Sequence, residues 1–229
     1  GMQALQAVQS LWIWASVTRT AMREVVRIPN LEVLDILEIR HPGKLEDFSQ
    51  ARCLKVFRCN HYMSEDDVLA VAQSPALEEL GAQNAVLTHE NLDALLRMPN
   101  LSALDLEATN FNDEMAAMMG CSEKIISLDV GGTNLTGQGL EMICQMKQLE
   151  SLDLWATDIS IDNMGCLHKL PKLERLCLGG EGLGFGFDEL YEFLNKLPAL
   201  KFLWLTDIKL EVHEVKAFKG RFEGFRYDE

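Results

Sequence analysis

Three consecutive stretches of the chain repeat one pattern: LSALDLEATNF from Leu101, IISLDVGGTNL from Ile125 and LESLDLWATDI from Leu149. Their first residues are 24 positions apart, and apolar side chains occupy the first, fourth, sixth and eleventh positions. A fixed period of this length indicates a chain built from stacked copies of one small unit. Such a chain shares its interior between neighbouring units and does not enclose one central core.

The pattern extends in both directions from these three stretches. Matching stretches start at Leu77 and Leu173, again 24 residues from their neighbours, and less regular ones occur nearer both ends. One segment, Val8 to Ser16, also admits a second interpretation as an amphipathic helix that caps the stack. We predict a single domain over residues 1–229, with ten strand segments that start near residues 8, 31, 54, 77, 101, 125, 149, 173, 200 and 222.

The second half of each repeat has the features of a short helix. A Ser or Thr stands where an apolar-periodic stretch begins, and its side-chain oxygen can accept a free backbone N–H at a helix start. Ser64 and Asp67 have the spacing of a capping box, with Asp in place of the usual Glu. A proline stands just before several of the next strands, where it ends the helix. We predict helices that begin at Thr18, Ser64, Thr88, Thr136 and Ser160.

The spacing LxxLxLxx(N/T)xL resembles the leucine-rich-repeat family, in its ribonuclease-inhibitor-like form with bacterial-type repeats of 23–24 residues. The resemblance implies an α/β fold, a right-handed solenoid (horseshoe) with a parallel concave sheet and helices on the convex side. The ninth position, usually Asn in that family, holds Thr109, Thr133 and Thr157. We expect a threonine ladder in its place. It would be interrupted at Ile39, Tyr62, Ala85, Glu181 and Ile208.

Composition disfavours nucleic acid and membranes as partners. The chain has 35 acidic and 21 basic residues and a formal charge of −14. It lacks the clustered Lys and Arg that bind phosphates or an anionic lipid surface. It also lacks an apolar run of the length that spans a bilayer. A net acidic surface favours basic partners.

The residues that commonly form catalytic or metal sites are scattered. The six cysteines fit no zinc spacing, so we expect reduced thiols that pack as small core side chains and a cytoplasmic location. Cys166 and His168 are close in sequence but diverge on a helix. The glycine-rich run from Gly179 to Phe187 fits no phosphate loop, and we interpret it as a loop that absorbs three extra residues. We predict no catalytic residue, no metal, no cofactor and no enzymatic activity.

Alternation along each strand defines a candidate surface. If positions four and six enter the core, positions three, five and seven face the concave side. Carboxylates at position five of adjacent repeats then form a column, and large aromatics and an arginine lie on the same side. Our alternative for the column is a solubilising choice common in the family, and for the aromatics a patch packed on its neighbours. We predict that partner binding uses Asp105, Glu107, Asp129, Asp153, Trp155, Arg175, Phe202 and Trp204.

These features favour a non-catalytic protein–protein interaction module. Its partner would be a protein with a basic surface bound on the concave face, and a monomer is favoured. One alternative is an exported effector-type module that acts in a host cell without a classical signal. A second is a self-associating structural repeat domain, because both ends of the pattern leave sheet edges without a polar cap.

Overall fold

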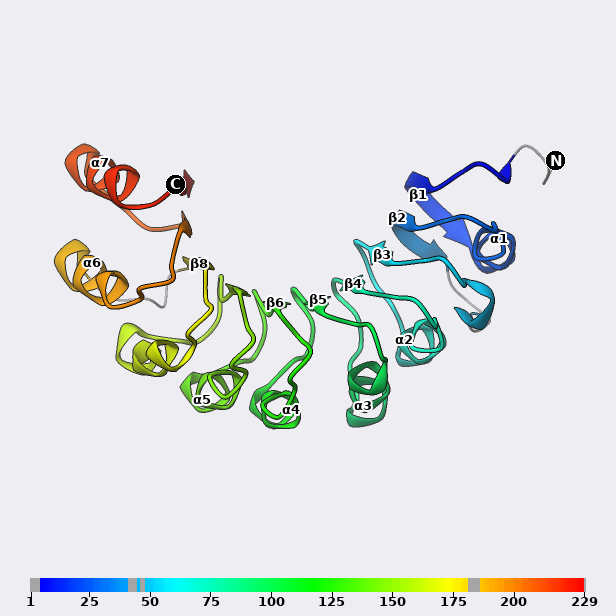
Figure 1. The fold of residues 1–229 in the computed structure, drawn as a ribbon, viewed down its shortest axis with the longest axis horizontal. Helices are drawn as coiled ribbons and strands as arrows, with labels where there is room; N and C mark the ends of the chain where they lie inside the picture. The colour runs from blue at the N-terminus through cyan, green and yellow to red at the C-terminus, as the bar shows by residue number, and fades with distance from the viewer. Residues whose placement is uncertain (1–4, 41–44, 46–47, 181–185, 229) are drawn as a thin grey trace. The chain divides into compact units, whose positions relative to one another are not determined.

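The computed structural model of the chain describes residues 5–40, 45, 48–180 and 186–228. The chain divides into two compact units, Gly1–Asn110 and Phe111–Glu229. Each unit contributes five of the described strands, and all of these are parallel to their partners (Figure 1).

The first unit alternates strands and short helices in chain order. Each strand pairs with the next along the chain, so that Leu34 lies opposite Phe57 and Phe57 lies opposite Leu80. Its elements are β1 (Ser10–Thr18), α1 (Arg19–Val25), β2 (Val33–Arg40), the 3-10 helix η2 (Phe48–Gln50), β3 (Val56–Cys59), α2 (Glu65–Val71), β4 (Glu79–Ala82), α3 (His89–Arg97) and β5 (Ala103–Asp105).

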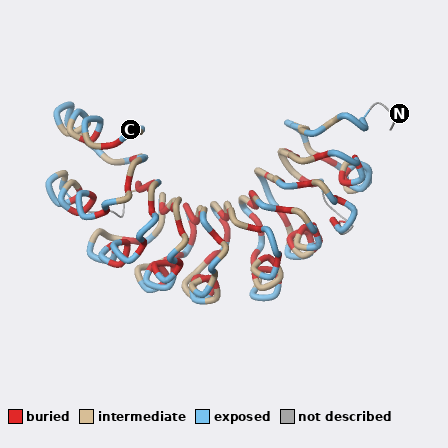
Figure 2. Tube along the Cα trace, viewed as in Figure 1, coloured by how far each residue is buried: buried red, intermediate tan, exposed pale blue. Residues whose placement is uncertain are grey.

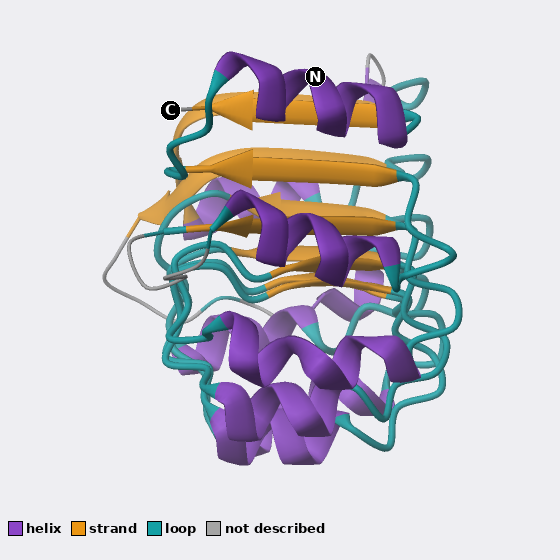
Figure 3. Cartoon of the chain, turned by 90° about the vertical axis from the view of Figure 1, so that its left-hand side faces the viewer, coloured by secondary structure: helices purple, strands orange, loops and turns teal. Residues whose placement is uncertain are grey.

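The second unit repeats the same arrangement, and its strands also pair in chain order. Figure 3 shows strands lying one above another, joined by turns at both ends. Its elements are α4 (Asp113–Met119), β6 (Ser127–Asp129), α5 (Gly137–Ile143), β7 (Ser151–Asp153), the 3-10 helix η3 (Ile161–Lys169), β8 (Arg175–Gly179), α6 (Phe187–Asn195), β9 (Phe202–Thr206), α7 (Val212–Arg221) and β10 (Gly224–Asp228).

All ten predicted strands are present, and each begins two residues after the repeat start. The segment from Val8 to Ser16 enters β1, so its interpretation as a capping helix is wrong. In each unit, buried segments gather where strands and helices face one another (Figure 2). As predicted, positions four and six form this core. They hold Leu34, Ile36, Phe57, Cys59, Leu80, Ala82, Leu104 and Leu106 in the first unit, and Leu128, Val130, Leu152, Leu154, Leu176, Leu178, Leu203 and Leu205 in the second.

The predicted helix starts are confirmed at all five positions. Thr18, Ser64, Thr88 and Thr136 each accept a backbone N–H with the side chain, whereas Ser160 precedes η3 without such a bond. The capping box of Ser64 and Asp67 is also confirmed. Each cap satisfies one backbone donor that a short helix leaves free, which matters more when the helix has only two turns. A fifth side-chain cap was not predicted: Asn112, which is neither Ser nor Thr, accepts the backbone N–H of Met115 at the start of α4.

The turn after each central strand uses one backbone conformation. Position eight adopts a positive φ in six repeats, from 50° to 102°. In three of these repeats a threonine follows, and Thr109, Thr133 and Thr157 each donate the hydroxyl over 2.7 Å to the carbonyl three residues earlier. Each of these hydroxyl bonds thus closes the turn of its own repeat. Glu181, one of the predicted interruptions of the threonine ladder, lies outside the described residues. The residues at position eight are Asn84, Ala108, Gly132, Ala156, Gly180 and Asp207.

The prediction of six reduced thiols is wrong for Cys144 and Cys166, which form a disulfide. Cys144 caps the end of α5 and Cys166 lies on η3, and their Cα atoms are 5.9 Å apart. Their separation of 22 residues is close to one repeat, so stacking brings them together although no short cysteine motif joins them. Among the free cysteines, Cys59 and Cys177 are buried as expected, and Cys121 is exposed.

Candidate partner-binding surface

The face of each unit's sheet that lies opposite its helices carries positions three, five and seven of the repeats. We call it the open face. In the second unit, register places Asp129 opposite Asp153, Asp153 opposite Cys177, and Cys177 opposite Trp204. The next pair is Trp204 with Arg226. The position-five row of this unit therefore runs from carboxylates to an aromatic ring and a guanidinium.

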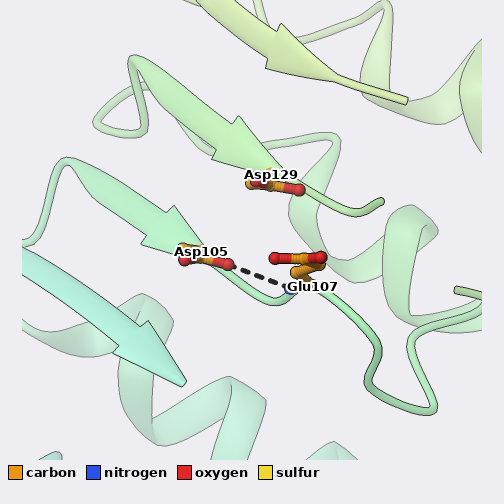
Figure 4. A group of neighbouring side chains, drawn as sticks. All are labelled: Asp105, Glu107 and Asp129. Carbon is orange, nitrogen blue, oxygen red and sulfur yellow. Dashed lines mark hydrogen bonds between the residues drawn. The ribbon is translucent and has the colours of Figure 1, made fainter. Parts of the chain in front are cut away.

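The aspartates at position five hold the start of the turn. Asp129 Oδ1 accepts the backbone N–H of Gly131 over 2.9 Å, and Asp153 Oδ1 accepts that of Trp155 over 2.8 Å. Asp105 does the same with Glu107 over 3.1 Å, as the dashed line in Figure 4 shows. A carboxylate is a strong acceptor for such a bond. These aspartates thus have a local structural role, which neither the binding interpretation nor the solvation interpretation had included.

On the first unit's open face, charged and amide side chains bond to one another. Gln83 Nε2 donates to Asp105 Oδ2 over 3.0 Å and to Glu107 Oε2 over 2.9 Å. Arg58 Nε donates to Glu79 over 2.7 Å, and Asn60 donates to Asp35 over 3.0 Å. Burial raises the pKa of Asp105, although the bonds from Glu107 and Gln83 act in the opposite direction. Many polar side chains of this face therefore already have hydrogen-bond partners within the chain.

Two tryptophans on the second unit's open face are held by carboxylates of later repeats. Trp155 Nε1 donates to Asp207 Oδ2 over 2.9 Å, and Trp204 Nε1 donates to Asp228 Oδ2 over 3.1 Å. The Trp155 ring reaches Asp207 by crossing Gly179, since a Cβ built on that glycine would lie 2.9 Å from Trp155 Cδ1. Each indole therefore has a fixed orientation along the sheet.

Arginines stack on the aromatic rings beside them. The Arg226 guanidinium lies 4.1 Å from the Trp204 ring centroid, and that of Arg175 lies 5.4 Å from the Phe202 ring. Phe202 leans over Gly224, whose built Cβ would lie 2.5 Å from Phe202 Cδ1. Phe202 and Trp204 remain 37% and 38% exposed. We call Trp155, Phe202 and Trp204 the aromatic platform, and the structure brings predicted Arg175 to its edge.

The structure adds residues that our site prediction did not contain. Arg226, Asp207 and Asp228 contact the platform directly. Trp12 pairs with Asp35 on the open face of the first unit and is 55% exposed, and Trp14, in the irregular stretch of β1 between Ile13 and Ser16, is 74% exposed. Counted from the repeat starts, all four tryptophans of the chain occupy position five or seven. That common placement was visible in the repeat numbering, whereas the contacts of Asp207 and Asp228 were not.

Replacing Gly179 with Ala is expected to lower the free energy of unfolding by about 1–3 kcal/mol, the usual cost of overpacking. The added Cβ would lie 2.2 Å from the Thr206 carbonyl oxygen and press on Trp155, so β9 or the indole must shift. Urea unfolding measures the loss, and the tryptophan emission of the folded variant reports the displaced indole. Gly165→Ala is the control, because nothing lies within 4 Å of its Cβ. Equal stability of both variants would contradict this account of Gly179.

The chain is similar to solved structures that share this repeat. Internalin C2 of Listeria monocytogenes matches at 16% identity with a TM-score of 0.58, over 89% of this chain and 83% of that one. A TDR receptor matches at 16% identity and 0.55, and the plant peptide hormone receptor RGFR1 in complex with RGF2 at 14% and 0.50. The chain is a leucine-rich-repeat solenoid. Internalins and receptors share the parallel strands and the helices that define it.

In both receptor matches the aligned region includes 90% of this chain but only 37% and 34% of the receptor chains. No family model matches its sequence, and no curated protein matches it. None of the helices in the described part of the solenoid has the length and apolar character needed to cross a bilayer. Within either unit taken by itself, no three described His, Cys, Asp or Glu side chains converge on one point as metal ligands would.

Proposed function

We propose that this solenoid is a non-catalytic interaction module that binds a protein with a basic surface through the open face of its second unit. One observation carries the proposal: the aromatic platform lies outside the core, partly exposed, and its two indoles are held by Asp207 and Asp228. Tryptophan and arginine are the residue types most enriched in interface hot spots. Rings that already have a fixed orientation lose little further entropy on binding.

Charge supports the basic partner. The open face beside the platform carries Asp129 and Asp153, and the whole chain has a formal charge of −14. Arg175 and Arg226 lie on the rings and provide donors for carboxylate or backbone oxygen atoms of a partner. A basic protein is therefore attracted over long range, and its specificity comes from contact with the rings.

The comparisons support a binding role in general terms. Internalins and receptors with this repeat are among the similar structures, and one of the receptors is solved in complex with RGF2. These structures are less than 25% identical to this chain, so they support the fold alone. The kind of partner and the binding face are our proposal. The same comparisons support the proposal that the module is not an enzyme. The carboxylates of Asp129 and Asp153 support it too, because they already accept backbone N–H groups of the turns that follow them.

Affinity capture from native lysate followed by competition tests this function. We expect Trp204→Ala and Trp155→Ala each to weaken binding of the captured partner about tenfold or more, as hot-spot truncations do. Val212→Ala serves as the control, since Val212 is a 71% exposed apolar residue at the start of α7. Unchanged affinity in the Trp155→Ala, Trp204→Ala double variant would overturn the proposed surface.

A further inference from the structure

Charge is unevenly distributed over the open face of the second unit. Apart from Trp155, the repeats of β6 and β7 place only short side chains on this face, and the charged ones among them are negative. At positions three, five and seven these repeats hold Ser127, Asp129, Gly131, Ser151, Asp153 and Trp155. Arg175 follows at position three of the next strand, β8, where it lies in register between Ser151 and Phe202. An exposed cation therefore stands next to an acidic part of the face.

The guanidinium of Arg175 contacts a ring rather than a carboxylate. It lies 5.4 Å from the ring centroid of Phe202, which stands on the strand opposite to that of Asp153. The carboxylate next to it in the sequence, Glu174, pairs with Lys201 over 2.6 Å. Among the described residues, none forms an ion pair with Arg175. Stacking covers the face of a guanidinium and leaves its edge donors, which match a carboxylate with two parallel hydrogen bonds. These donors are therefore suited to a carboxylate that another molecule supplies.

We propose that Arg175 determines specificity by binding a carboxylate side chain of the protein partner, while a cationic side chain of the same partner binds over Asp129 and Asp153. The inference rests on the proposed function and adds the order of charges that the partner must present. Asp129 and Asp153 keep their negative charge while they accept backbone N–H groups, so they still attract a cation. A partner that is basic overall but carries one acidic side chain in the right place satisfies both sites.

Arg226 favours the β6 and β7 end of the face for the partner's cation. Its guanidinium already lies 4.1 Å from the Trp204 ring centroid, so a cation of the partner at that ring would meet a like charge. Over β6 and β7, whose repeats have all their open-face positions described, the two aspartates are the only charged side chains, and Ser127, Gly131 and Ser151 beside them are short. Attraction at one end and repulsion at the other therefore select one placement of the partner.

The register sets the distance between the two charges of the partner. Asp129 on β6 is two strands away from Arg175 on β8. Paired strands lie about 4.8 Å apart, so the two residues are roughly 10 Å apart across the sheet. An extended segment covers this distance in about three residues, at roughly 3.3 Å each. A segment that crosses the strands with a basic side chain and, about three residues away, an acidic one would therefore contact both sites.

Calorimetric titration of the full chain with short peptides tests this order of charges. The probes are the blocked peptide Lys-Lys-Gly-Phe-Glu and its reverse, Glu-Phe-Gly-Lys-Lys, so that both chain directions are covered, and a second pair with Gln in place of Glu. We expect the tighter-binding Glu peptide to bind about tenfold more tightly than its Gln counterpart, and we expect Arg175→Gln to abolish this preference, as a coupled pair requires. Asp153→Asn keeps an oxygen that can accept the Trp155 N–H, and it should weaken binding of both peptides.

Arg221→Gln is the matched control, because Arg221 also lies over a ring, 4.9 Å from the Phe222 centroid, but belongs to helix α7. This variant should retain the full preference for Glu. Equal affinity for the Glu and Gln peptides in the wild type, a preference that survives Arg175→Gln, or no binding of either Glu peptide would each overturn the inference. The proposed function is judged separately, because loss of the captured partner in the Trp155→Ala, Trp204→Ala double variant supports it whatever the peptides show.

Discussion

Replacing Arg19 with Met is expected to lower the free energy of unfolding by about 3–5 kcal/mol, the cost of leaving one partner of a buried ion pair alone. Arg19, the first residue of α1, reaches Asp67 on α2, with Nη2 donating to Oδ2 over 3.0 Å and Nη1 paired with Oδ1. The Asp67 side chain is fully buried, and that of Arg19 is 10% exposed. Asp67 also caps α2 through Ser64, so the variant leaves a buried carboxylate that also organises a helix.

The loss should depend on pH in a defined direction. Burial raises the pKa of Asp67, but hydrogen bonds from Arg19 and Ser64 outweigh it, and the net pKa lies below the usual value. A carboxyl with a lowered folded pKa stabilises the protein above its unfolded pKa of about 3.9, and the effect disappears as pH falls through the folded pKa. Without Arg19, burial dominates and Asp67 becomes neutral more easily. The difference between wild type and Arg19→Met should therefore shrink from pH 7 toward pH 4.

Urea unfolding at several pH values measures both effects. Arg97→Met is the control, because Arg97 is 78% exposed and pairs with Asp93 within α3. Its expected loss in the free energy of unfolding is about 0.5 kcal/mol or less. Arg19→Met combined with Asp67→Asn should recover part of the loss, since the amide removes the unpaired charge while its oxygen can still accept from Ser64. An Arg19→Met protein as stable as wild type at pH 7 would contradict a stabilising pair.

Breaking the disulfide between Cys144 and Cys166 is expected to cost about 3 kcal/mol, as estimated for a closed loop of this size. The bond joins sulfur atoms 22 residues apart, and both side chains are buried between α5 and η3. Urea unfolding with and without reductant should show this difference for the wild type. The double variant Cys144→Ala, Cys166→Ala should be insensitive to reductant and similar to the reduced wild type.

Thiol counting provides an independent measurement of the same bond. Under denaturing conditions without reductant, alkylation should modify four of the six cysteines, and all six after reduction. Cys121→Ala is the control, because this exposed free cysteine takes no part in the bond. Six reactive thiols before reduction would show that the pair is open. The bond also removes the argument that scattered cysteines indicate a reducing compartment, so the cytoplasmic location stays a prediction.

Much of the architecture could be predicted because a single period governs it. The spacing of Leu101, Leu104 and Leu106 recurs in each repeat, and it defines both where a strand begins and which side chains enter the core. The alternation of side chains along each strand likewise predicted that Asp129, Asp153, Trp155, Phe202 and Trp204 lie on the open face. Helix starts followed from local chemistry, because a cap needs only one oxygen near the first turn.

Contacts between repeats depended on the tertiary structure. Trp155 bonds Asp207 across an intervening repeat, Arg19 pairs with Asp67 on a different helix, and Cys144 meets Cys166 one repeat away. The partial exposure of Leu11 and Ile13 also depended on the tertiary structure. The amino-acid sequence by itself determined the repeat, the strands and the side on which each residue stands, since alternation is a property of the local backbone. Which side chain leans over which neighbour was decided only by stacking, because lean and rotamer depend on the room that the next repeat leaves.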